Sequence, residues 1–177
     1  MRRIICISGD AACGKTTAAN RVLALLPDWR SLSTGTRFRE HCRAHGLDPQ
    51  QISELDDEIH RSFDAAVHDE LAGARNLVAE ARLVGYLARS MPDALRVYCS
   101  CALPVRAARA AMREPEFSAA EHEVRLAARD AADTAKFLRL YGVDYHDPRF
   151  YHRVLDTSVL GPDEVATAIV EAARESS

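Results

Sequence analysis

Along the chain, short apolar runs alternate with longer stretches in which apolar residues recur every three or four positions. The short runs predict strands, and the longer stretches predict amphipathic helices. The runs expected to form strands are residues 4–7, 29–32, 77–80, 95–101 and 153–156. Because a helical stretch lies between each strand and the next, the pattern predicts a three-layer α/β fold: a five-stranded parallel sheet with helices on both faces. Ligands of such sheets bind at the carboxyl ends of the strands.

Signals at helix starts divide the chain in the same way. Ser33-Thr34 precedes a helix, Asp48-Pro49 begins a longer one, Leu103-Pro104 begins another, and Gly161-Pro162 precedes the last. Proline at a first helical position has no N–H to lose, and serine or threonine caps a helix start. The long helix after Asp48 is expected to bury Ile52, Leu55, Ile59, Phe63 and Val67.

The stretch around Pro115 interrupts the helical pattern. Ser118 and Glu121 then form a capping box for a new helix that runs toward Gly142. We interpret residues 113–121 as a small helical lid between two helices. In the second of these helices, the spacing predicts a buried apolar stripe at Val124, Ala128, Ala131, Ala135 and Leu138.

Length and composition fit one domain, residues 1–177, that can bury its own core. Hydrophobic residues make up 47% of the chain, charged residues 28%, and the net charge is −3. Without a broad basic field, binding to a nucleic acid polymer or to a membrane surface is not expected. The apolar run at residues 4–7 is too short for a signal peptide or a membrane span, and the cysteines are odd in number. We therefore expect a cytoplasmic monomer with free thiols.

The first chemical signal follows the first predicted strand. Residues 9–16 match the pattern G-x-x-x-x-G-K-[ST] of a phosphate-binding loop. Its two glycines let backbone N–H groups turn toward phosphate oxygens at a helix start, where the macrodipole favours anions. Lys15 is expected to reach the β- and γ-phosphates of a nucleotide, and Thr16 to ligate Mg²⁺. The residues expected to bind ATP in this loop are Gly9, Asp10, Ala11, Ala12, Cys13, Gly14, Lys15, Thr16 and Thr17.

Arginines flank the predicted lid. Phosphoryl transfer needs cations placed around a charge-rich, in-line geometry more than it needs covalent chemistry. One side of the helix entering the lid carries Arg106, Arg109 and Arg113, and one face of the helix leaving it carries Arg129, Asp133 and Lys136. Closing the lid would bring both sets onto one phosphate region. The alternative is that both are ordinary solvated faces, with an ion pair between Arg129 and Asp133.

Together these segments resemble the nucleoside monophosphate kinases, and among them the cytidylate kinase-like group. Residues 33–39 are similar to the S-T-G-x-x-x-R motif of adenylate kinases, and residues 80–85 to the E/D-G-R-x-x-G motif of cytidylate kinases. Residues 129–136 resemble R-D-x-x-D-x-x-R, and residues 141–144 and 154–158 resemble the tail of the group. The resemblance spans nearly the whole chain and implies a P-loop NTPase fold.

On the acceptor side, the resemblance assigns roles to single residues. Thr34 and Arg39 would hold the acceptor nucleotide, within a helical acceptor-binding region at about residues 34–72. Arg82 would bind the phosphate of the acceptor. Glu80, at the end of a strand beside the loop, either orders a Mg²⁺-bound water or acts as a capping or ion-pairing carboxylate.

Around the lid, the resemblance assigns roles to the two basic sets. Arg109 would lie over the adenine of ATP, and Arg113 would meet its phosphates. Arg129, Asp133 and Lys136 would contact phosphate, ribose and base in that order. Of these residues, Arg113 and Arg129 are expected to act with Lys15 as the catalytic residues, because their charges would stabilise the transferring phosphoryl group.

Some positions depart from the family pattern. Lys136 replaces an arginine, which would make a planar bidentate contact that lysine cannot make. Ala81 adds a Cβ where the family has glycine, and Ala12-Cys13 replaces the Gly/Ser-rich interior of the loop. For Cys13 we expect a tolerated small side chain; the alternative is a thiol whose oxidation blocks nucleotide binding.

The combined signals predict a kinase that uses ATP and Mg²⁺ to phosphorylate a pyrimidine nucleoside monophosphate, with CMP or dCMP as the expected acceptor. Nucleotide substrates are the expected partners. Two alternatives stay open. Lys136 and Ala81 also fit a kinase of a modified nucleotide or another small molecule in specialised metabolism. A nucleotide-dependent switch without transfer would use the phosphate loop alone and would need no second anion site.

Overall fold

A computed structural model of the chain describes residues 2–44, 46 and 57–175, and the side chains of Arg39 and His41 lie outside this description. Its centre is a five-stranded sheet in the order β2-β3-β1-β4-β5, with every neighbouring pair parallel. The strands are β1 (Ile4–Gly9), β2 (Arg30–Ser33), β3 (Leu77–Glu80), β4 (Ala94–Ser100) and β5 (Arg153–Asp156). All the predicted strands are present, and their ends differ from the prediction by two residues at most.

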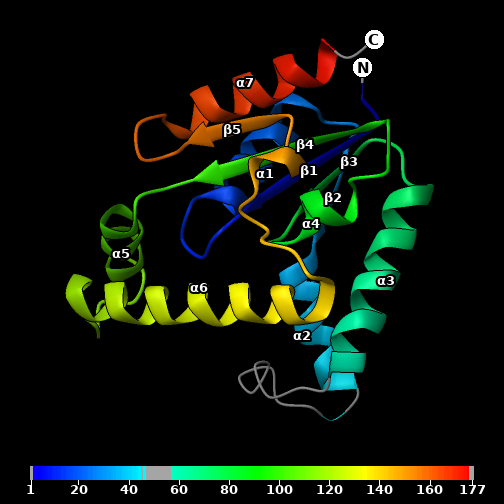
Figure 1. Ribbon diagram of the computed structural model, residues 1–177. Helices are drawn as coiled ribbons and strands as arrows, with labels where there is room; N and C mark the ends of the chain where they lie inside the picture. The colour runs from blue at the N-terminus through cyan, green and yellow to red at the C-terminus, as the bar shows by residue number, and fades with distance from the viewer. Residues whose placement is uncertain (1, 45, 47–56, 176–177) are drawn as a thin grey trace.

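Helices cover both faces of this sheet, which confirms the predicted three-layer fold (Figure 1). They are α1 (Lys15–Leu25), α2 (Thr34–Ala44), α3 (Asp57–Gly73), α4 (Val84–Leu87), α5 (Leu103–Ala111), α6 (Ala119–Tyr141) and α7 (Pro162–Arg174), with a 3₁₀ turn at Pro148–Phe150. One apolar core lies between the sheet and the pair α1 and α7, and the other lies between the sheet and α3 and α4. None of the described helices is long and apolar enough to cross a membrane.

The central strand β1 decides where a ligand can bind. Its side chains alternate between the two cores and all are buried, as in a parallel sheet covered on both faces. After β1 the chain runs to one edge of the sheet at β2 and returns to β3; β4, on the other side of β1, follows. This reversal makes the carboxyl end of β1 the topological switch point, where α/β sheets bind ligands.

Helix α6 begins as predicted but buries a different face. The Ser118–Glu121 capping box is present, with the Glu121 N–H donating to Ser118 Oγ. The predicted apolar stripe is wrong, because Val124 is 71% exposed and Leu138 is 58% exposed. The opposite face is buried instead, through His122, Leu126, Asp133, Phe137 and Leu140. Apolar residues lie on both faces of this helix, and the face that turns inward carries Leu126, Phe137 and Leu140 together with Asp133, which pairs with Arg82 and Lys136.

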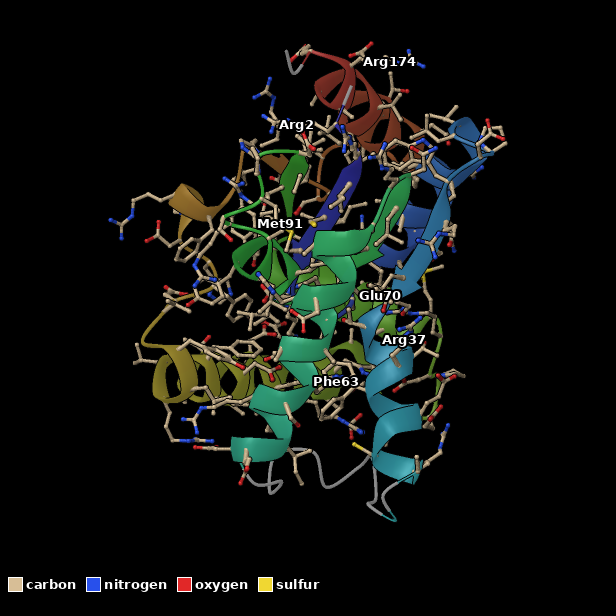
Figure 2. The ribbon with its side chains drawn as sticks, turned by 90° about the vertical axis from the view of Figure 1, so that its right-hand side faces the viewer. Arg2, Arg37, Phe63, Glu70, Met91 and Arg174 are labelled. Atoms are coloured by element: carbon tan, nitrogen blue, oxygen red, sulfur yellow. The ribbon has the colours of Figure 1, made fainter. Side chains whose placement is uncertain are left out.

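Helices α2 and α3 form a pair that stands away from the sheet at one end. Figure 2 shows them side by side, with Arg37 on α2 facing Glu70 on α3, and these two side chains form an ion pair. Phe63 on α3 meets Phe38 on α2 edge to face, with ring centroids 4.8 Å apart. The predicted helix start at Asp48-Pro49 and the apolar positions Ile52 and Leu55 lie outside the described residues.

Short helix α4 was not predicted, because four residues are too few to show a helical period. It packs tightly under the loop that follows α6. A Cβ added at Gly85 would lie 2.3 Å from the ring of Tyr151, and the Gly85 N–H donates to Ser8 Oγ at 2.9 Å. Close approach of the ring therefore requires glycine at this position.

Candidate active site

The phosphate loop joins the end of β1 to the start of α1. Gly14 has a φ of 95°, in the left-handed region that favours glycine. A Cβ at Gly9 would lie 2.6 Å from Cys13 Sγ and 2.7 Å from the Cys99 carbonyl oxygen, so a side chain does not fit there. In the described structure no side chain caps α1. The backbone N–H groups of its first turn are therefore left to an anionic ligand.

The charged and hydroxyl groups of the loop lie close to this helix start. Lys15 Nζ donates to the Asp10 carbonyl oxygen at 2.9 Å across the loop, and Thr16 and Thr17 are exposed. Glu80 ends β3 in register with Ile7 of β1, and it is buried. Its Oε1 accepts a hydrogen bond from Ser33 Oγ at 2.7 Å. The loop thus has a carboxylate on the neighbouring strand, as expected.

Asp10 places a carboxylate inside the loop, and three side chains hold it. Its oxygens accept hydrogen bonds from Tyr98 Oη at 3.1 Å and Tyr145 Oη at 2.5 Å, and His146 Nε2 lies 3.1 Å away. Burial alone would raise the pKa of Asp10, but the hydrogen bonds from His146 and Tyr145 outweigh it and lower this pKa. The contact with Asp10 in turn raises the pKa of His146, with further help from Asp144. This arrangement anchors the loop to the segment that follows α6.

We expect the wild-type protein to become less stable as the pH rises above 6.5 because His146 loses its proton. The His146→Gln variant is expected not to show this loss of stability. The pKa of His146 is raised from its ordinary value of 6.5, so its contribution is complete below that pH and is lost as the pH rises through the folded pKa. Burial lowers the pKa of Lys136 from 10.5 to about 8, so loss of its proton raises stability as the pH approaches and passes 8, and it does so equally in the wild-type protein and the variant. The pKa of His152 is lowered, mainly by burial, so His152 changes the pH dependence of stability below pH 6.5.

The measurement is the midpoint of thermal unfolding between pH 6.5 and 8. Glutamine at position 146 can still donate to Asp10 but does not titrate. The matched control is His68→Gln, at a half-exposed position on α3. A wild-type pH profile in the His146→Gln variant would contradict the assignment.

A cavity of about 130 Å³ opens beside the start of α1. Its lining residues are Gly14, Thr17, Ala18, Arg109, Thr157, Leu160, Pro162 and Val165. Arg109 is fixed there, with Nη2 donating to the Thr157 carbonyl oxygen at 2.7 Å. Thr157 Oγ1 donates to the Cys13 carbonyl oxygen at 2.6 Å, which ties the cavity to the phosphate loop. The apolar wall and the planar guanidinium suit a flat aromatic base next to the phosphate site.

The other arginines around the predicted lid differ in burial. Arg106 is buried; its Nη2 lies 2.8 Å from Asp130 Oδ2 on α6, and its Nη1 donates to the Ala11 carbonyl oxygen at 3.2 Å. It therefore joins α5, α6 and the phosphate loop. Arg113, beyond the end of α5, and Arg129, on α6, are exposed. Arg106 and Arg109 both lie on the side of α5 that faces the phosphate loop, Arg106 through the Ala11 carbonyl oxygen and Arg109 through Thr157, and Arg113 lies beyond the end of this helix.

A second polar cluster combines residues from two distant segments. Arg82, just after β3, forms an ion pair with Asp133 of α6, and Asp133 Oδ1 accepts a hydrogen bond from Lys136 Nζ at 2.8 Å. These side chains are only 10–15% exposed. Among the described residues, Asp133 thus pairs with Arg82 and Lys136 instead of with Arg129. Thr34 is also buried and donates to the Glu80 carbonyl oxygen at 3.2 Å, while the Arg39 side chain lies outside the described part of the chain.

The residues that brace the loop were missed by the sequence reasoning. Tyr98, Tyr145 and His146 come from β4 and the loop after α6, and no pattern links them to Asp10. A carboxylate inside a phosphate-binding loop opposes its ligand electrostatically and therefore needs donors around it, which is a signal that donors exist but not which residues supply them. Thr157 lies in the segment noted only for its resemblance to the family tail.

Cys13 is fully buried under the loop. Burial, the largest influence, raises the pKa of its thiol. The thiolate is the form that reacts with oxidants, and buried cysteines are inert structural residues. The structure therefore favours the tolerated small side chain over the oxidation alternative.

Comparison with known proteins agrees with this geometry. The Cytidylate kinase-like family matches residues 24–159 of the chain. The cytidylate kinases of Pyrococcus furiosus and Pyrococcus abyssi are each 34% identical to it over 173 residues. These matches cover 96% of this chain, and 87% and 92% of the two relatives respectively.

Solved structures share the fold at low sequence identity. Shikimate kinase from Acinetobacter baumannii, in complex with shikimate, has a TM-score of 0.64 at 16% identity, covering 97% of this chain and 93% of the other. A gluconokinase from Sinorhizobium meliloti has a TM-score of 0.61 at 16% identity, covering 98% and 94%. The fold is therefore that of the P-loop kinases. With the family match over most of its length, the chain belongs to the cytidylate kinase-like family and is a nucleoside monophosphate kinase.

Proposed function

We propose that this enzyme transfers the γ-phosphoryl group of ATP to CMP or dCMP, with Mg²⁺ as its cofactor. The observation that carries the proposal is the 34% identity, over 96% of the chain, to proteins named cytidylate kinase. The similarity to shikimate kinase and gluconokinase extends to the fold alone, and so gives no support to another acceptor. The buried cluster of Arg82, Asp133 and Lys136 supports an acceptor site, which a nucleotide switch would not need.

In this proposal the phosphate loop and the cavity beside it hold ATP. The uncapped N–H groups at the start of α1 and the Lys15 ammonium bind the β- and γ-phosphates. To do so, Lys15 Nζ exchanges its contact with the Asp10 carbonyl oxygen for phosphate oxygens. The adenine lies in the cavity next to Arg109, against the wall formed by Leu160 and Pro162.

The residues beside the loop fit a magnesium ion. Mg²⁺ prefers oxygen ligands and keeps several waters, so one or two protein oxygens are sufficient next to the phosphates. The exposed Thr16 hydroxyl would ligate it, and the buried Glu80 carboxylate, oriented by Ser33, would hold one of its waters. The bound ion would neutralise charge that develops on the transferring phosphate.

The acceptor lies across from the loop, between α2, α3 and α6. Thr34, Arg39 and Arg82 hold its phosphate end, and Asp133 and Lys136 face its ribose and base. One acceptor phosphate oxygen forms the new bond to the γ-phosphorus as the bond to the β–γ bridging oxygen breaks, which gives CDP and ADP. Phosphate oxygens are nucleophilic at neutral pH, so no side chain has to remove a proton.

The remaining expectations concern motion and charge. We propose that residues 34–72 form the acceptor-binding region and residues 113–121 the lid of a single kinase domain. Arg113 and Arg129 are exposed in this structure, which leaves them able to move toward the γ-phosphate when the lid closes over both substrates. Their charges would then stabilise the transition state beside Lys15.

A panel of nucleoside monophosphates tests the proposal. With Mg²⁺ and ATP, we expect a coupled assay to detect ADP formation with CMP and dCMP. ADP formation is expected to be weaker with other acceptors. The proposal is overturned if the enzyme binds ATP at the concentrations used but phosphorylates none of CMP, dCMP and UMP. Shikimate and gluconate serve as acceptors that are expected to give no ADP.

A further inference from the structure

A second cavity lies at the edge of the sheet opposite the phosphate loop. It has a volume of about 250 Å³ and is lined by Arg2, Leu95, His152, Arg153, Ala172 and Glu175. These residues lie at the amino ends of β1, β4 and β5 and at the end of α7. Strand β4 has seven residues at about 3.3 Å each, which separates the cavity from the phosphate loop by roughly 20 Å. Nothing in the phosphoryl transfer derived above uses this cavity.

Arg2 is anchored at this edge by its backbone. Its N–H donates to the Ala173 carbonyl oxygen at 2.8 Å, and Figure 2 shows Arg2 near the end of α7, where Arg174 is labelled. In the side chain, Nε of Arg2 is buried and has no hydrogen-bond partner within the described part of the chain. A buried donor without a partner costs free energy, and a ligand that accepts its hydrogen bond recovers that free energy.

His152 supplies a second donor to the cavity. Its Nδ1 accepts a hydrogen bond from the Arg96 backbone N–H at 3.0 Å, so in the neutral ring the proton is on Nε2. Burial lowers the pKa of His152, and the positive charges of Arg96, Arg2 and Arg153 lower it further. The three guanidinium groups are therefore close enough to the ring to oppose another positive charge there.

The positive charge around the cavity is only partly compensated. Arg153 Nη2 lies 2.8 Å from Glu175 Oε2, the carboxylate of the lining. Arg96 is held by a neutral group, because its Nε donates to the Phe150 carbonyl oxygen at 2.7 Å. Among the ion pairs of the described residues, none includes Arg2 or Arg96. Like charges at short distance repel one another, so this arrangement favours the binding of an anion.

A phosphate group fits this cavity better than a carboxylate does. It carries close to two negative charges near pH 7, and its oxygens accept hydrogen bonds from several directions. A carboxylate is planar and carries one negative charge. The donors here come from different segments, since Arg2 precedes β1, whereas His152 and Arg153 lie at the start of β5.

We propose that the cavity between Arg2, His152 and Arg153 binds a phosphate group, supplied either by free phosphate or by the phosphate end of a nucleotide. Arg2 Nε and His152 Nε2 donate to its oxygens, and Arg153 shares its charge between the phosphate and Glu175. The site is separate from the phosphate loop and from the Arg82 cluster. It does not depend on which acceptor the enzyme phosphorylates.

The test follows the pKa of His152 by NMR of its imidazole ring, identified by the signal that the His152→Gln variant lacks. The pH titration is run in millimolar phosphate and in sodium chloride of the same ionic strength. We expect phosphate to raise the pKa of His152 by about one unit, because a nearby negative charge favours the protonated ring. The groups that face this ring, Arg96, Arg2, Arg153 and Glu175, are the same in both solutions. His146 reports phosphate bound at the phosphate loop instead, so the two sites are distinguished.

Variants of the cavity give opposite expectations. Arg2→Met is expected to abolish the phosphate-dependent rise, and Arg3→Met, its matched control, to keep it, since Arg3 is half-exposed and pairs with Asp93. Glu175→Gln removes the opposing carboxylate and is expected to lower the half-saturating phosphate concentration several-fold. Circular dichroism checks that each variant is folded, and the gain in Glu175→Gln decides if Arg2→Met does not fold.

Two sources of the phosphate group are compared by repeating the titration with CMP. A lower half-saturating concentration for CMP than for phosphate supports the proposal with a nucleotide as ligand, and the reverse supports it with free phosphate. The proposal is overturned if the pKa of His152 is the same in phosphate and in chloride. It is also overturned if folded Arg2→Met keeps the full rise, or if Glu175→Gln binds phosphate no more tightly than the wild type.

Discussion

Replacing Lys15 by methionine is expected to lower kcat by about 10²- to 10³-fold, as removal of one preorganised donor does in other active sites. The ammonium lies at the start of α1, on the loop that is expected to hold the β- and γ-phosphates, where negative charge grows during transfer. Within the described part of the chain, its one hydrogen bond goes to the Asp10 carbonyl oxygen of its own loop. The loss should therefore fall on the transition state, and the free energy of unfolding should change little.

Steady-state kinetics with ATP and CMP, together with urea unfolding, measure both effects. Arg21→Met provides the control, because it removes a cation from the same helix at an exposed position that pairs with Asp163. That variant is expected to keep the wild-type kcat. A Lys15→Met enzyme with a kcat within a few-fold of wild type would remove Lys15 from the catalytic residues.

Replacing Arg82 by methionine should abolish most transfer while ATP binding stays nearly intact. Arg82 lies in the buried cluster with Asp133 and Lys136, away from the cavity beside the phosphate loop. In this structure the Asp133 carboxylate forms an ion pair with the Arg82 guanidinium, the group that is expected to hold the acceptor phosphate. We expect kcat/KM for the acceptor to fall by about 10²-fold or more, because a charged hydrogen-bond partner of the reacting phosphate is lost.

Calorimetric titration with ATP and acceptor-dependent ADP formation separate the two effects. Arg75→Met is the control, since Arg75 is exposed in the turn that leads into β3. Its kinetics should match the wild type. Equal losses in ATP affinity and in transfer would contradict an acceptor role for Arg82, and so would unchanged transfer.

How far the sequence predicts the fold depends on which signals are local. The strands were predicted to within two residues because each is a short apolar run with turn residues at its ends. The capping box at Ser118 and the proline at the start of α7 likewise act over three or four residues. The buried face of α6 was mispredicted, because its inward side includes Asp133, which is buried only because Arg82 and Lys136 compensate its charge.

In the candidate site, the same distinction separates the phosphate-loop motif from the distant side chains that hold the loop in place. The residues of the phosphate loop are contiguous in sequence, so the loop could be predicted. The brace on Asp10 could not be predicted, because Tyr98 and Tyr145 are 88 and 135 residues away from it in the chain. The bond of Thr157 to the Cys13 carbonyl oxygen spans 144 residues. Such contacts depend on how distant segments meet, and no local spacing records them.

By itself, the sequence determined an α/β fold with a phosphate-binding loop after its first strand, since apolar periodicity, helix caps and the two loop glycines are properties of neighbouring residues. Only the tertiary structure decided which charges meet. It placed Arg82 against Asp133, turned Arg106 inward to Asp130, and joined Asp64 of α3 to Tyr141 of α6. The physical reason is that burying a charge is favourable only with a partner or donor near it, and these partners come from elements that only folding brings together.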